Sequence, residues 1–144
     1  MGTGPTILIC DDEASIRQLV AMKLRSAGFE VVDARNGLEG YCCCDPSALP
    51  PGATPRVPAP IVPALVVTDL QMPIMSGIEM AVKLRAFAPT SRVPVLMLTA
   101  RGYILNQDEV AQSNIRSVMG KPFAGQQLLD KVRAMLSESA SQAA

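Results

Sequence analysis

Five polar residues of this sequence could together bind a metal ion and a phosphoryl group: Asp11, Asp12, Asp69, Thr99 and Lys121. Three carboxylates in one pocket would raise one another's pKa values strongly, but a hard divalent cation among them makes the arrangement tolerable. Mg²⁺ prefers such oxygen ligands and keeps several of its waters. A lysine ammonium and a threonine hydroxyl nearby would bind further phosphoryl oxygens. The residue types therefore predict a metal-assisted phosphoryl site, provided that the fold brings them together.

Each of these residues has an ordinary structural explanation when it is taken alone. Asp12 could cap a helix that begins near Glu13. A threonine at the end of a strand is commonly a turn residue, and a lysine before a proline commonly faces solvent. The functional interpretation depends on finding all five at one place in the fold.

The apolar pattern along the chain alternates between short runs and helical spacing. The short runs predict strands at 6–10, 29–34, 64–69, 93–99 and around 116–119. Spacings of three and four predict a first helix that stops at Gly28 and others near 38–44, 78–84, 105–113 and 128–136, with Asn114 ending the fourth. Strands that alternate with helices predict an α/β fold with a doubly wound parallel sheet covered on both faces.

The carboxyl ends of parallel strands lie at one edge of such a sheet, and binding groups gather there. Asp11 and Asp12 follow the first expected strand, and Asp69 ends the third. Thr99 ends the fourth expected strand, and Lys121 follows the fifth. The fold predicted from the apolar pattern therefore brings the five candidate residues to the same edge.

A proline-rich segment interrupts the pattern between Pro46 and Pro63, which contains seven of the twelve prolines. Because proline lacks an amide donor and restricts the residue before it, this segment is expected to be irregular and to replace part of the second helix after Cys44. It could be a tolerated surface insertion or a partner-binding arm, and the first is favoured. We expect one domain over residues 4–139, with a flexible polar tail at 140–144.

Composition excludes several other classes of protein. Thirteen basic and thirteen acidic residues give no net charge, so direct nucleic-acid binding is not expected. Apolar runs fall short of the ~20 residues of a membrane span, and the start of the chain does not resemble a signal peptide, so a cytoplasmic protein is expected. Its four cysteines are expected to be reduced structural thiols. The chain has no histidine, which removes the usual general base at neutral pH.

Four stretches resemble the receiver domain of response regulators in two-component signalling: "ILICDDEASIR", "LVVTDLQMPIMSGIEM", "VPVLMLTARG" and "GKPF". The resemblance covers nearly the whole chain outside the proline-rich segment. It implies a flavodoxin-like fold with five parallel strands in the order 2-1-3-4-5. It also implies a sensor histidine kinase or phosphotransfer protein as phosphoryl donor, and a downstream protein or output domain that the sequence does not identify.

The same resemblance implies a role for each candidate residue. Asp69 would be the phosphoacceptor. Mg²⁺ would be bound by Asp69, directly by Asp12, through water by Asp11, and by the backbone carbonyl of Gln71. Thr99 and Lys121 would each bind a phosphoryl oxygen, and a cis peptide bond to Pro122 would aim the lysine.

The chain departs from the usual receiver pattern at several positions. Val118 stands where receivers usually carry a switching aromatic ring, and its β-branched side chain cannot make the same swing. Tyr103 could substitute for that ring, and Arg101 and Gln71 flank the site where they could influence acyl-phosphate hydrolysis. Val118 and the altered second helix leave open a degenerate receiver that only binds proteins, although the presence of all five candidate residues argues against it. A phosphohydrolase is disfavoured because Gln71 is an amide where a second carboxylate would be needed.

Overall fold

The computed structural model describes residues 4–100 and 104–143, and its centre is one parallel sheet. Its strands are β1 (Thr6–Cys10), β2 (Glu30–Ala34), β3 (Leu65–Asp69), β4 (Val95–Ala100) and β5 (Ile115–Lys121). They pair in the order β2-β1-β3-β4-β5, and every neighbouring pair is parallel. The predicted fold class and strand order are therefore confirmed.

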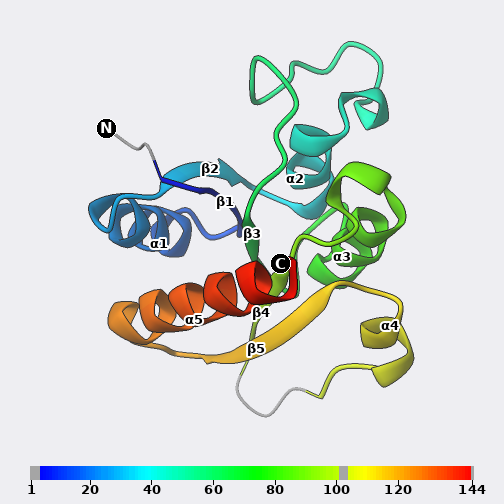
Figure 1. Ribbon diagram of the computed structural model, residues 1–144. Coiled ribbons are helices and arrows are strands. Elements are labelled where there is room, and N and C mark those ends of the chain that lie inside the picture. Colours follow the sequence, from blue (N-terminus) through cyan, green and yellow to red (C-terminus); the bar gives the residue numbers. More distant parts are fainter. Residues whose placement is uncertain (1–3, 101–103, 144) are drawn as a thin grey trace.

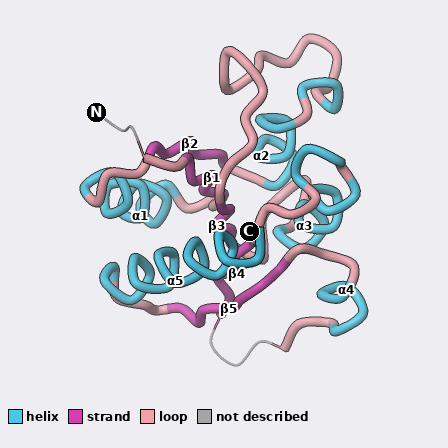
Figure 2. The backbone as a smooth tube through the Cα atoms, viewed as in Figure 1, coloured by secondary structure: helices cyan, strands magenta, loops and turns pink. Residues whose placement is uncertain are grey.

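Helices cover both faces of the sheet, as Figures 1 and 2 show. The helices are α1 (Ala14–Ser26), α2 (Gly37–Cys44), α3 (Gly77–Ala86), α4 (Gln107–Ala111) and α5 (Gly125–Ala143). Apolar residues of α1 and α5 pack with Ile7 and Ile9 of β1 on one face. Those of α2 and α3 pack with Leu8 and Cys10 of the same strand on the other face. Alternate residues of β1 thus enter two separate cores, which explains its continuous apolar sequence.

Three expected element boundaries were wrong. β5 is longer than expected and runs from Ile115 to Lys121, whereas α4 is shorter and ends at Ala111. Asn114 does not end that helix: its buried side chain donates 2.6 Å to the carbonyl of Val93. The flexible tail was expected at 140–144, but residues 140–143 belong to α5, since alanine and glutamine are good helix formers and no glycine or proline interrupts them.

The proline-rich segment follows α2 as a single 3₁₀ turn at Pro46–Ala48 and then irregular chain, drawn as the long loop above α2 in Figure 2. It is attached to the domain at several points. The amide of Ile61 donates 2.9 Å to the carbonyl of Cys43, and Val57 and Ile61 pack against the core beside α2. These inward contacts favour the surface insertion over a free partner-binding arm.

All four cysteines are free and buried. Among the residues that the structure describes, none of the helices is both long enough and apolar enough to cross a bilayer.

Candidate functional site

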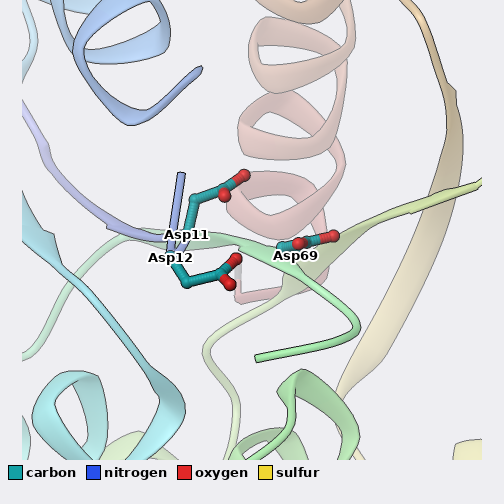
Figure 3. Close-up of side chains that lie close together, drawn as sticks. All are labelled: Asp11, Asp12 and Asp69. Carbon is teal, nitrogen blue, oxygen red and sulfur yellow. The ribbon is translucent and has the colours of Figure 1, made fainter. Parts of the chain in front are cut away.

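Three carboxylates lie together where β1 and β3 end (Figure 3). The two strands are hydrogen-bonded neighbours, so Asp11 and Asp12 after β1 lie beside Asp69 at the end of β3. One carboxylate oxygen from each of the three residues lies within 4.8 Å of those of the other two. Such a group of hard oxygen ligands suits Mg²⁺.

Asp11 is the buried member of this acid cluster, with 1% of its surface exposed. Its Oδ1 accepts the amide of Glu13 at 2.9 Å, which satisfies a free donor at the start of α1. Burial raises the pKa of Asp11; the Glu13 amide and Lys121 lower it by less, while Asp69 raises it further. Asp12 is exposed and does not cap the helix, because Glu13 occupies the N-cap position. Its carboxylate is thus left available to the cleft.

Lys121 reaches this cluster from β5, although β4 lies between β5 and β3. Its Nζ lies 3.2 Å from Oδ1 of Asp69 and 3.4 Å from Oδ2 of Asp11. Burial lowers the pKa of the lysine, but the two carboxylates outweigh that effect and raise the pKa above its usual value. The bond to Pro122 is cis, as the resemblance implied. Lys121 is therefore a charged donor held between two carboxylates.

Backbone contacts hold Asp69 at the strand end. Its Oδ1 also accepts the amide of Leu70 at 2.9 Å, and its side chain remains mostly buried. Gly77, the first residue of α3, lies directly against it: a Cβ on Gly77 would come within 2.2 Å of the Asp69 carbonyl oxygen. The amide of Gly77 donates 2.9 Å to the carbonyl of Leu70. A side chain at residue 77 would push α3 away from the phosphoacceptor candidate, a role that its motif alone did not reveal.

Thr99 lies at the end of β4 and is 3% exposed. Its hydroxyl donates 2.9 Å to the carbonyl of Ala100, so it must turn to bind a phosphoryl oxygen. Gln71 lines the cleft beside Asp69. Val118 is 47% exposed on β5, and Arg101 and Tyr103 lie outside the described residues.

The turn after Asp69 has an unusual backbone at Ile74. This residue has a φ of 71°, and the amide of Met75 donates 2.7 Å to the carbonyl of Pro73 across it, as in a γ-turn. A β-branched residue rarely adopts a positive φ, because its side chain crowds the backbone. Ile74 is also 76% exposed, so burial does not offset that strain.

A cleft of about 590 Å³ opens over the acid cluster. Its polar lining includes Asp12, Asp69 and Lys121, and its apolar lining includes Leu19 of α1 and Phe123 after β5. Leu19 is 58% exposed. A molecule that enters the cleft would therefore pass apolar side chains before it meets the charged groups.

Sequence reasoning missed a residue that contacts the backbone of the acid cluster, Arg17. Arg17 of α1 is buried, and its Nη1 donates 2.8 Å to the carbonyl oxygen of Asp11. Its Nε lies 2.9 Å from Oδ2 of Asp33 in β2. Arg17 is part of the quoted "DDEASIR" stretch, but the sequence does not reveal which carboxylate it pairs with.

The curated relatives of this chain include transcriptional regulatory proteins. The chain is 34% identical over 133 residues to the phosphate regulon transcriptional regulatory protein PhoB of Pseudomonas aeruginosa, covering 92% of this chain and 52% of PhoB. It is 34% identical over 135 residues to the transcriptional regulatory protein SrrA of Staphylococcus aureus, covering 94% and 49%. The chain thus spans about half the length of these curated relatives.

A solved structure with a similar fold is the chemotaxis response regulator CheY4 of Vibrio cholerae. It superposes with a TM-score of 0.74 at 27% identity and covers 92% of this chain and 98% of its own. The family described as the response regulator receiver domain matches residues 7–133, nearly the whole described fold. The chain with the Asp11, Asp12 and Asp69 cluster therefore belongs to the receiver domains of two-component response regulators.

Proposed function

We propose that this receiver domain accepts a phosphoryl group on Asp69 with the help of Mg²⁺. The observation that carries the proposal is the position of the Asp69 carboxylate, which lies 3.2 Å from Lys121 and within the acid cluster. An ionised carboxylate carries no proton to remove, so attack by such a nucleophile needs no general base. This is consistent with a chain that has no histidine.

In the proposed transfer, an oxygen of Asp69 attacks the phosphorus in line, and the bond from phosphorus to the donor breaks. The product is an acyl phosphate on Asp69, and the electron pair of the broken bond leaves with the donor. Lys121 and, after rotation, the Thr99 hydroxyl offset the charge on the phosphoryl oxygens. Asp11, Asp12, Asp69 and the carbonyl of Gln71 would hold the ion. Mg²⁺, when bound, neutralises part of the charge that develops on the phosphoryl group.

The partner that fits this chemistry is a histidine kinase or phosphotransfer protein that carries a phosphohistidine. Such a donor must reach Asp69 through the cleft, where Leu19 and Phe123 offer an apolar rim for docking. The output would be a shift in a pre-existing conformational equilibrium that follows rotation of Thr99. Because Val118 cannot act as the usual aromatic switch, a downstream partner would read another surface change.

Phosphorylation of the purified chain tests the proposal. Acetyl phosphate and Mg²⁺ should give one phosphoryl adduct by intact mass, and Asp69→Asn should abolish it. Glu138→Gln, a substitution on the exposed end of α5, is the matched control and should phosphorylate normally. No adduct at saturating Mg²⁺ would favour a degenerate receiver that only binds proteins. Rapid turnover of acetyl phosphate without an adduct would favour a phosphohydrolase.

A further inference from the structure

We propose that Arg56, in the proline-rich segment, is a positioning residue for the acid cluster and acts through Asp33 and Arg17 on Asp11. The inference rests on the proposed function, since it assigns a support to the same metal site. The proline-rich segment lies outside the four receiver stretches, and this inference assigns it a role in phosphorylation.

The first link joins Arg17 to the site. Its guanidinium has two fixed acceptors, the carbonyl of Asp11 at 2.8 Å and Oδ2 of Asp33 at 2.9 Å. The Asp11 carbonyl belongs to the peptide unit that continues into Asp12. The orientation of Arg17 therefore affects the backbone that carries both carboxylates.

The second link joins the proline-rich segment to Asp33. Nη2 of Arg56 lies 3.4 Å from Oδ2 of Asp33, the same oxygen that pairs with Arg17. Nε of Arg56 also donates to the backbone carbonyl of Asp33 and lies 3.3 Å from Oε1 of Glu39. Arg56 thus contacts both the side chain and the backbone of Asp33. Through Glu39 it also connects β2 with α2.

The Arg56 side chain is only 31% exposed, so its contacts are partly shielded from solvent. The segment around it is also attached by Val57 and Ile61, which pack against the core. Arg56 contacts Asp33 at two points, the carboxylate and the backbone carbonyl, and partly shielded contacts of this kind hold a side chain better than a single exposed ion pair does. Without Arg56, Arg17 would be the remaining ion-pair partner of the Asp33 carboxylate among the described residues. Asp33 would then be held less firmly, and so would the guanidinium of Arg17 that pairs with it.

Charge and positioning predict opposite effects of removing Arg56. A cation near the acid cluster repels Mg²⁺, so loss of its charge alone would tighten Mg²⁺ binding, mainly at low salt. Loss of positioning would weaken Mg²⁺ binding instead. The direction of the change therefore identifies the mechanism.

The test measures Mg²⁺ affinity by calorimetry and acetyl-phosphate phosphorylation across Mg²⁺ concentrations, both at physiological salt. Arg56→Ala should weaken Mg²⁺ binding about threefold to tenfold, below the loss typical when a direct second-layer partner of a metal site is removed. Its phosphorylation rate should fall at low Mg²⁺ and recover at saturating Mg²⁺. Arg56→Gln, which keeps one donor, should lie in between, and Thr54→Ala in the same segment should match the wild type.

A double-mutant cycle with Asp33→Asn tests the route. If Arg56 acts through Asp33, the double variant should bind Mg²⁺ no more weakly than Asp33→Asn alone. Unchanged or tighter Mg²⁺ binding by folded Arg56→Ala and Arg56→Gln would overturn the inference. Additive losses in the cycle would also overturn the assigned route. Failure of the proposed function itself would look different, because the wild type would then form no adduct.

Discussion

The ammonium of Lys121 lies 3.2 Å from a carboxylate oxygen of Asp69, although β4 separates the strands that carry them. The same nitrogen contacts Asp11 at 3.4 Å. One lysine therefore bridges the acid pair after β1 and the phosphoacceptor candidate on β3.

Replacement of Lys121 by alanine should slow phosphorylation of Asp69 by about 100-fold, because a preorganised cation on the phosphoryl oxygens is lost. The rate of adduct formation with acetyl phosphate, followed by intact mass, measures this. Lys131→Ala on α5 removes an equal charge outside the site and should leave the rate unchanged. Equal rates for Lys121→Ala and the wild type would show that the ammonium does not take part.

Replacement of Asp11 by asparagine should raise the melting temperature at neutral pH without Mg²⁺ and weaken Mg²⁺ binding. Burial raises the pKa of Asp11 in the folded chain above its usual value of 3.8, so ionisation of this group costs stability. The protonated Asp11 side chain contributes its full stabilisation of the folded state below pH 3.8, and this stabilisation is lost as the pH rises through the folded pKa. Asparagine can still accept the Glu13 amide.

The pH dependence provides the control for this prediction. Thermal melts from pH 3 to pH 7 should show the stability gap between Asp11→Asn and the wild type closing as the pH falls toward 3.8. A gap that stays constant over this range would contradict the assignment to ionisation. The variant Asp108→Asn in α4 removes an exposed carboxylate and is the control for a general effect of losing one acidic charge.

Replacement of Ile74 by glycine should raise the free energy of unfolding by about 1 kcal/mol, because glycine adopts a positive φ without the steric cost of a Cβ. Little burial is lost, since Ile74 is 76% exposed. Chemical denaturation measures the change. Ile74→Ala keeps the Cβ and should gain much less, and equal stabilisation by alanine and glycine would point to a cause other than backbone strain.

The thiols of α2 should resist alkylation in the folded chain. Burial raises the pKa of Cys43 to about 11, although the nearby Arg56 lowers it in part, and burial raises the pKa of Cys44 to about 12. Only the thiolate reacts, so at pH 8 labelling of Cys43 should be on the order of 100-fold slower than that of an ordinary cysteine. Peptide mapping after brief iodoacetamide treatment measures this. The same protein in urea should label rapidly at all four cysteines, and fast native labelling of Cys43 would contradict the prediction.

The sequence predicted the parts of this molecule that local patterns determine. Buried apolar runs predicted the strands, and the residues that follow them predicted Asp11, Asp12, Asp69 and Lys121 at one edge of the sheet. The structure brings these four together. The orientation of the Thr99 hydroxyl could not be predicted from the sequence, because the hydroxyl can bond either to the Ala100 carbonyl, as it does here, or to a ligand.

Side-chain partners that depend on tertiary packing could not be predicted from the sequence. Arg17 could have paired with any nearby carboxylate, and only the folded chain brings Asp33 to it. Asparagine is common at helix ends, but tertiary packing buries Asn114, whose side chain donates to the carbonyls of Val93 and Thr90. The polar residues at the end of the chain were expected to form a tail, but α5 continues through them to Ala143. Their helix propensity is sufficient because no glycine or proline interrupts the stretch.

The bond from Arg56 to the Asp33 carbonyl has a consequence for self-association. β2 is an outer strand, and its amide at Glu30 and carbonyl at Ala34 bond with the β1 side, so the carbonyls of Val31 and Asp33 face outward. Arg25 donates to the first of these at 3.3 Å, and Arg56 donates to the second. Both outward acceptors are occupied by arginines, so a strand from another molecule would have to displace two charged side chains before it could extend the sheet.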